Sequence, residues 1–110
     1  MAGRPRRFDV YLIVLDPVRG SEIAKTRPCV VVSPDEINEV VRTLIVVPLT
    51  SRTRDDYAFR VRSRFGGREG DLAIDQLRSV DRSRLVRRLG RLDEATSRAL
   101  AERLVDTFVL

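Results

Sequence analysis

The chain of 110 residues contains no histidine, and this absence restricts the chemistry that it can perform. Histidine is the usual general acid and base near neutral pH. Zinc sites that contain histidine, Ser-His-Asp triads and Cys-His dyads are therefore excluded. Any catalysis has to use arginine, lysine, carboxylates, hydroxyl groups or the substrate itself.

Cysteine and long apolar runs are also scarce. Cys29 is the one cysteine and lies in a valine-rich segment, which rules out an internal disulfide and indicates a small buried side chain. No apolar run approaches the roughly 18 residues of a membrane span, and no apolar signal-peptide core follows the basic residues 1–7. We therefore expect one soluble domain over residues 1–110, with residues 1–7 as a basic arm, no membrane partner and a cytoplasmic location.

Lysine is nearly absent as well, since 20 of the 21 basic residues are arginine, and the formal net charge is +5. The planar guanidinium group matches the geometry of phosphate oxygens better than an ammonium group does. This composition favours a polyanionic partner such as a nucleic acid. A solvated basic surface and an acidic protein partner are the alternatives.

Short apolar segments separated by polar turns run through most of the chain, and their length and alternation predict strands at residues 8–15, 27–33, 43–50, 57–65, 71–76 and 85–92. Turn residues predict a hairpin turn at 66–70 and a polar bend at 79–83, and residues 34–38 suffice for one helical turn. A helix is expected at residues 93–108, with Asp93 as its cap. The expected fold is mainly β with a C-terminal helix, a small SH3-like barrel built from a strongly curved antiparallel sheet.

The most informative pattern is a pair of strand ends. One strand begins with the sequence KTRP at residues 25–28, and another ends with PLTS at residues 48–51. Arg27 and Thr50 thus each lie beside a proline and a loop, where a rigid backbone can present a polar side chain to a substrate. A small site that contains one guanidinium and one hydroxyl group is expected there.

Several segments, taken in order along the chain, carry a resemblance to a known family. They are Asp9-Val10-Tyr11-Leu12, Asp16-Pro17 with Gly20-Ser21-Glu22, residues 25–33, residues 46–51 and residues 75–85. Together they make the chain similar, over about residues 9–92, to the type II toxin family named for MazF and PemK, also called Kid.

The resemblance implies an SH3-like barrel that forms a symmetric homodimer. It also implies a metal-independent endoribonuclease, without a cofactor, that cuts single-stranded RNA at short sequence motifs. A cognate antitoxin with an acidic, disordered tail would lie across the RNA groove and inhibit the enzyme. RNA and antitoxin would then compete for one basic surface.

Carried over position by position, the catalytic arginine of the family falls on Arg27 and its catalytic threonine on Thr50. The loop that closes on RNA falls on residues 20–22, and Glu22 is the best candidate for a general base. The residues expected to bind RNA are Ser21, Lys25, Ser51, Gln76, Arg78 and Arg84.

These residue types suit RNA cleavage without histidine. RNA supplies its own nucleophile, the 2′-hydroxyl, so the protein has to accept a proton, stabilise the phosphorane charge and supply a proton to the 5′-oxygen. We expect Arg27 to stabilise charge, because a guanidinium gives up its proton reluctantly, and Thr50 to hydrogen-bond a phosphate oxygen. The expected products are a 2′,3′-cyclic phosphate and a 5′-hydroxyl.

Structural roles for the same residues are kept as alternatives. Arg27 could pair with Glu22 or Asp81 instead of binding phosphate. Thr50 could simply end its strand by bonding the backbone. The arginines within residues 60–64 and 78–91 suit either a phosphate track or a solvated face.

Two further features bear on the function. The acidic pairs Asp55-Asp56 and Asp71/Asp75 could hold magnesium, but the spacing fixes no third acidic ligand, which disfavours a two-metal nuclease. Phe8 stands where the family commonly has glycine, so the conformation of the basic arm is left open.

The rival functions are a non-enzymatic toxin that binds DNA gyrase, as the CcdB family does, and an RNA-binding barrel without catalysis.

Overall fold

Three neighbouring strands consist largely of β-branched and aliphatic residues, the composition that favours a sheet covered on both faces. The computed structural model describes residues 4–109. Its central strands are β1 (Asp9–Val14), β2 (Thr26–Val31) and β3 (Thr43–Thr50).

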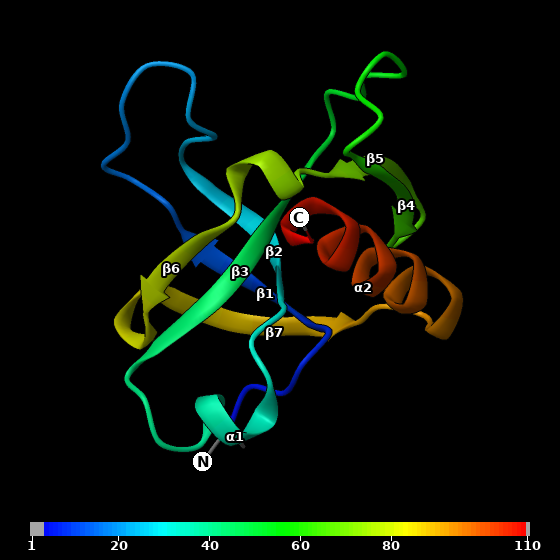
Figure 1. The fold of residues 1–110 in the computed structure, drawn as a ribbon. Coiled ribbons are helices and arrows are strands. Elements are labelled where there is room, and N and C mark those ends of the chain that lie inside the picture. Colours follow the sequence, from blue (N-terminus) through cyan, green and yellow to red (C-terminus); the bar gives the residue numbers. More distant parts are fainter. Residues whose placement is uncertain (1–3, 110) are drawn as a thin grey trace.

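The other elements are α1 (Asp35–Asn38), β4 (Val61–Phe65), β5 (Arg68–Leu72), the 3-10 turn η1 (Ile74–Gln76), β6 (Arg78–Asp81), the 3-10 turn η2 (Arg82–Arg84), β7 (Leu85–Arg91) and α2 (Glu94–Phe108). The strands form one antiparallel sheet in the order β4-β5-β3-β2-β1-β7, and β6 also pairs with β3. This sheet curls into a half-barrel with α2 packed against it (Figure 1). The expected fold, mainly β with a C-terminal helix, is confirmed.

The curled sheet has an apolar layer on each face because successive strand residues point to opposite sides. One layer contains Val30 and Val47 and is covered by α2 through Leu100. The other layer contains Val31 and Cys29. Burial raises the pKa of the Cys29 thiol to about 12, so this thiol stays protonated at neutral pH.

The C-terminal helix begins and ends close to its predicted limits. Asp93 caps it by accepting the Thr96 N–H at 2.6 Å, and Arg98 pairs with Glu94 one turn away. Leu100 is fully buried. Phe108, the last residue of α2, is 67% exposed, so the packing of the helix against the sheet ends before its last turn.

Three local predictions are wrong. The strand expected at 57–65 begins only at Val61, because the preceding residues form turns. The strand expected at 71–76 lies earlier, as β5, because the hairpin turn consists of Gly66 and Gly67 alone, both with positive φ. The polar bend expected at 79–83 is partly strand, since β6 pairs with the first half of β3.

Phe8 adopts a backbone angle that favours glycine. Its φ is 72°, and its backbone donates to the Val31 carbonyl at 2.7 Å and accepts from the Leu92 N–H at 3.1 Å. The described part of the basic arm is held nearby, because the Arg7 N–H donates to Asp35 at 2.8 Å. The arm prediction for residues 1–3 lies outside the described residues.

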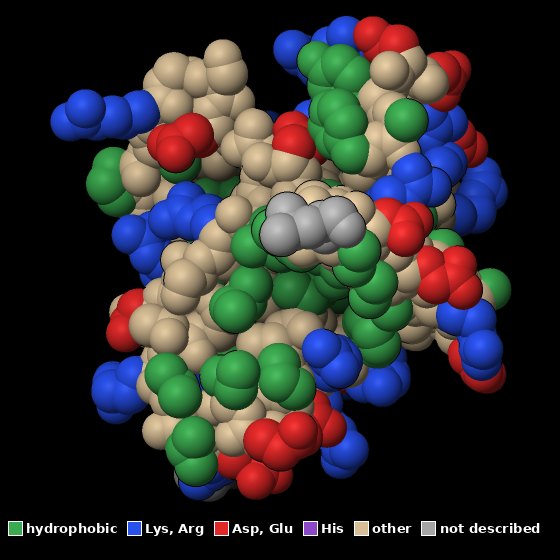
Figure 2. Space-filling view, in the orientation of Figure 1, with side chains coloured by type: hydrophobic (Ala, Val, Ile, Leu, Met, Phe, Trp, Pro, Cys, Tyr) green, Lys and Arg blue, Asp and Glu red, His purple; other side chains and the backbone are tan. Residues whose placement is uncertain are grey.

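Exposed apolar side chains form several patches on the surface (Figure 2). One is the C-terminal end of α2, where Val105 and Phe108 are exposed. Another is the segment of α1 and the residues after it, where Ile37, Val41 and Val40 are exposed, Val40 by 81%. Within residues 4–109, no helix combines the length and the apolar character that a bilayer span requires.

Candidate active site

Arg27 and Thr50 lie at adjoining ends of two neighbouring strands, β2 and β3. These strands pair in a register that places Cys29 opposite Pro48. Arg27 lies two residues before Cys29, and Thr50 lies two residues after Pro48. Because side chains alternate along a strand, both point to the same face of the sheet as that pair. The guanidinium of Arg27 and the hydroxyl of Thr50 line one cleft.

A cleft of about 390 Å³ opens beside this pair. Its walls come from the β1–β2 loop, the end of β3, the segment that follows β3, and η1. The predicted site residues that line this cleft are Ser21, Glu22, Arg27, Thr50, Ser51 and Gln76. Segments that are far apart in the sequence thus converge on one concave surface.

Arg27 is positioned by its own strand. Its Nε donates to the Ala24 carbonyl at 3.1 Å, which fixes the side chain at the mouth of the β1–β2 loop. Among residues 4–109 it forms no ion pair, so the alternative pairing with Glu22 or Asp81 does not occur. Its terminal nitrogens are therefore available to an anion in the cleft.

The Thr50 hydroxyl takes part in the backbone contact that was considered as its structural role. Its Oγ1 accepts the Arg52 N–H at 3.2 Å. A hydroxyl that accepts one hydrogen bond still has a proton to donate. The structural contact and a contact to substrate are therefore compatible.

Glu22 lies on the opposite wall, in the β1–β2 loop. One carboxylate oxygen, Oε1, accepts the Arg19 N–H at 2.6 Å, which closes a tight turn within the loop. Gln76 holds the same loop from η1, because its Oε1 accepts the Ile23 N–H at 3.1 Å and its Nε2 donates to the Ser21 carbonyl at 3.4 Å. These two bonds from Gln76 hold the β1–β2 loop in place beside the cleft.

Lys25, Arg78 and Arg84, also predicted to bind RNA, do not line this cleft. Arg78 donates to the Leu15 carbonyl at 3.0 Å, and Arg84 donates to the Val14 and Asp16 carbonyls at 3.1 and 2.6 Å. These bonds hold the end of β1 and the start of the loop. Both arginines therefore hold the β1–β2 loop, which forms one wall of the cleft, and do not line the cleft themselves.

Sequence reasoning considered Arg60 as part of a phosphate track but did not place Arg52, Arg54 and Tyr57 in a wall of the cleft. The guanidinium of Arg54 lies 4.1 Å from the centre of the Tyr57 ring, and that of Arg60 lies 4.9 Å from it. The signal in the sequence was their position, since this segment directly follows Ser51. The residues of this wall are Arg52, Arg54, Tyr57 and Arg60.

The acidic pairs considered for magnesium are bound to arginines. Asp56 pairs with Arg54 at 2.8 Å, which lowers the pKa of the Asp56 carboxyl. Asp75 accepts two hydrogen bonds from Arg60. Within the part of the chain that the structure describes, no three histidine, cysteine or acidic side chains gather in a way that suits a metal ion.

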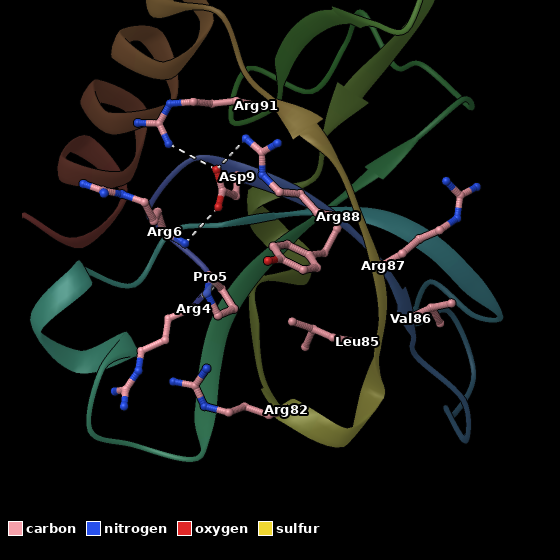
Figure 3. A pocket seen from close by; sticks show the side chains of 11 residues that line it. Arg4, Pro5, Arg6, Asp9, Arg82, Leu85, Val86, Arg87, Arg88 and Arg91 are labelled. Carbon is pink, nitrogen blue, oxygen red and sulfur yellow. Dashed lines mark hydrogen bonds and ion pairs between the residues drawn. The ribbon is translucent and has the colours of Figure 1, made fainter. Parts of the chain in front are cut away.

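A second basic hollow lies on a different face, over β1 and β7 (Figure 3). Arg88 and Arg91 each lie 3.2 Å from a carboxylate oxygen of Asp9, which is 3% exposed. The arginines that surround this hollow are Arg4, Arg6, Arg82, Arg87, Arg88 and Arg91. The arginines between residues 78 and 91, considered as one phosphate track, therefore fall into two groups. Some line this hollow, whereas Arg78 and Arg84 bond the β1–β2 loop.

Comparisons with known proteins agree with this geometry. The family described as "PemK-like, MazF-like toxin of type II toxin-antitoxin system" matches residues 6–108. The endoribonuclease MazF9 of Mycobacterium tuberculosis is 37% identical over 108 residues, which cover 90% of this chain and 92% of the relative.

Solved structures give the same answer. MazF of Deinococcus radiodurans superposes with a TM-score of 0.83 at 27% identity, covering 96% of this chain and 97% of the other. A MazE-MazF complex from the same organism has a TM-score of 0.74 at 25% identity, covering 96% and 97%. The chain belongs to the PemK-like, MazF-like toxin family of type II toxin-antitoxin systems.

Proposed function

We propose that this chain is an endoribonuclease toxin that cuts single-stranded RNA within short sequence motifs, with the cleft beside Arg27 and Thr50 as its active site. The observation that carries the proposal is the convergence of a guanidinium, a hydroxyl and the carboxylate of Glu22 on one open cleft. The family match and the 37% identity to an endoribonuclease support the activity.

The proposed reaction is a transesterification within the RNA. The 2′-oxygen loses its proton to Glu22 and forms a bond to the neighbouring phosphorus. The bond from phosphorus to the 5′-oxygen breaks, and this oxygen takes up a proton from water, while Glu22 returns its proton to the solvent. The products are a 2′,3′-cyclic phosphate and a 5′-hydroxyl.

Arg27 stabilises the additional negative charge that develops on the phosphorus centre. Preorganised cations and hydrogen-bond donors act strongly here because they need no reorientation during the reaction. The bond from Arg27 Nε to the Ala24 carbonyl provides this preorganisation. Thr50 donates its hydroxyl proton to a non-bridging phosphate oxygen, while its Oγ1 stays fixed by the Arg52 N–H.

The proposed RNA contacts divide into two groups. Ser21, Ser51 and Gln76 line the cleft and can hydrogen-bond base edges. Lys25 is exposed at the base of the β1–β2 loop and would meet the RNA backbone. Arg78 and Arg84 act through the loop that they hold.

The reaction requires no metal ion in this proposal. The carboxylates that could hold one are already engaged, Asp75 by Arg60 and Asp71 by Arg62. A charged guanidinium supplies the electrostatic stabilisation that a divalent cation would otherwise give.

The proposed partners are single-stranded RNA, a cognate acidic antitoxin and a second copy of this chain. The family description names a toxin-antitoxin system, and the excess of arginine suits an acidic partner segment. The exposed apolar residues of the α1 segment suit a surface covered by a second copy. The proposed site of action is the cytoplasm, where RNA is available.

Replacement of either central residue tests this assignment. We expect Arg27→Ala and Thr50→Ala each to lower kcat for a single-stranded RNA oligonucleotide by about 10²- to 10³-fold, with an unchanged melting temperature. Arg98→Ala is the matched control, because Arg98 is an exposed arginine on α2 outside the cleft. Cleavage by the Arg27 and Thr50 variants within a few-fold of wild type would contradict the assignment.

The same RNA incubation separates the rival functions. Discrete cuts support the nuclease. Retention of RNA without cuts would support an RNA-binding barrel. If the chain neither cut nor retained RNA, a toxin that binds gyrase would be favoured. The family match and the open cleft disfavour both rivals.

A further inference from the structure

Asp71 is a buried carboxylate placed next to the proposed active site. It is 1% exposed and lies on β5, directly opposite Thr50 in the β3–β5 ladder. On its other side it faces Arg62 of β4. Since paired residues point to the same face, the side chains of Arg62, Asp71 and Thr50 form a row across the sheet, and this row ends at the cleft that Thr50 shares with Arg27.

The two carboxylate oxygens of Asp71 have different partners. Oδ1 accepts the Arg62 Nε–H at 2.7 Å, which joins Asp71 to the neighbouring strand. Oδ2 accepts the backbone N–H of Arg54 at 2.8 Å. The second bond ties down residues 51–60, the cleft segment, which provides one wall of the cleft.

The cleft segment has few other attachments at this end. The Arg52 N–H bonds Thr50 Oγ1, and Arg62 also pairs with the exposed carboxylate of Asp55. Exposed ion pairs contribute little. A charge-assisted bond to a buried carboxylate is stronger, so Asp71 is the main anchor of the Arg54 end of this wall. The other end is held by the bonds from Arg60 to Asp75 and from Arg103 to the Ala58 carbonyl.

We propose that Asp71 is a positioning residue for RNA cleavage, holding the cleft segment so that its basic and aromatic side chains meet the substrate. This inference rests on the proposed function. Asp71 does not react with RNA itself, because both oxygens are engaged and the side chain is closed to solvent. Its effect passes through the backbone of Arg54.

Asp71→Asn tests the inference, because an amide can accept only one of the two hydrogen bonds and presents its NH₂ group to the other donor. Asp9→Asn is the matched control. Asp9 is also buried and bonded to arginines, but it is the first residue of β1, pairs with β7 and does not line the cleft. Both variants are compared with wild type at a temperature where all three are folded.

Two readouts are needed. The first is the KM and kcat for a single-stranded RNA oligonucleotide, where Asp71→Asn should raise KM about tenfold with kcat within about threefold. The second is limited trypsin digestion, where cleavage after Arg52 or Arg54 should be about tenfold faster in Asp71→Asn, without a matching increase elsewhere. Asp9→Asn should show neither change.

The outcomes are distinct. An unchanged KM and an unchanged trypsin pattern in folded Asp71→Asn would overturn the inference, and so would equal changes in both variants, since these would indicate general destabilisation. A wild-type chain that cuts no RNA would overturn the proposed function and the substrate role of Asp71 with it. The trypsin pattern would in that case still decide whether Asp71 anchors the cleft segment.

Discussion

Lys25 holds a backbone conformation that is unfavourable for any residue with a Cβ atom. Its φ is 70°, a left-handed angle that costs a non-glycine residue roughly 1 kcal/mol or more. The loop keeps it there, because its N–H donates to Asp16 at 3.0 Å and its carbonyl accepts the Leu15 N–H at 2.8 Å. Strain of this kind gathers at functional sites.

Substitution of Lys25 separates strain from function. We expect Lys25→Gly to raise the free energy of unfolding by about 0.5 kcal/mol, since relief of the strain exceeds the entropic cost of glycine. The same variant should raise KM for RNA several-fold if the ammonium group meets the RNA backbone. Lys25→Asn tolerates the angle and also lacks the charge, so it should raise KM equally. An unchanged KM in both variants would remove Lys25 from the RNA site.

At the scale of elements, the contact between β5 and β3 fixes the position of Thr50. A Cβ atom added at Gly70 would lie 2.7 Å from the Thr50 carbonyl oxygen, which belongs to the backbone and has little freedom to move. Glycine therefore lets β5 approach the end of β3 closely. The hydroxyl of Thr50 depends on this approach for its direction.

Gly70→Ala should disturb the site as well as the fold. We expect a loss of about 1–3 kcal/mol in the free energy of unfolding and a lower kcat in the protein that remains folded. Ser63→Ala is the control, because Ser63 lies opposite Gly70 in the β4–β5 ladder and its buried hydroxyl has no hydrogen-bond partner among the described residues. Ser63→Ala should leave kcat unchanged and should not lower the free energy of unfolding, because it removes a buried hydroxyl that has no partner among the described residues. An equal loss of kcat in the two variants would contradict this account.

Elements whose sequence pattern reflects burial in the core were predicted well, and elements with few buried residues were not. β3 and α2 were located well, because a run of β-branched residues and a capped helical repeat are strong signals. The strand expected at 57–65 was wrong at its start, because the alternation of Tyr57 and Phe59 comes from a ring stack at 4.9 Å within a turn. β6 was missed because Val80 is its single buried residue.

At the scale of the whole molecule, the fold places some of the predicted site residues in the cleft and others outside it. That Arg27 and Thr50 line one cleft could be expected from the sequence, because Arg27 lies near the start of one strand and Thr50 at the end of another, each near a proline. The roles of Arg78 and Arg84 as supports of the loop, and of Asp71 as a buried anchor, could not. These roles depend on contacts between distant segments, which local patterns in one sequence do not encode.

A second copy of the chain should cover the exposed α1 segment. Val40 is 81% exposed, and a charge at a covered apolar position is costly. We expect wild type to sediment at micromolar concentration with twice the mass of one chain, and Val40→Asp to shift the mass toward that of a monomer. Val40→Thr, which keeps the shape without a charge, should remain dimeric. A monomeric wild type would contradict the proposed dimer.

The chemistry of the cut RNA ends tests the central claim most directly. A long unstructured RNA is incubated with the purified chain in excess EDTA, and the ends are mapped and identified. We predict cuts at a recurring short motif, each with a 2′,3′-cyclic phosphate and a 5′-hydroxyl, and a rate of cutting about 10²- to 10³-fold lower with Arg27→Ala. Loss of cleavage in EDTA, or ends that carry a 5′-phosphate, would contradict a reaction in which the ribose attacks its own phosphate beside Arg27 and Thr50.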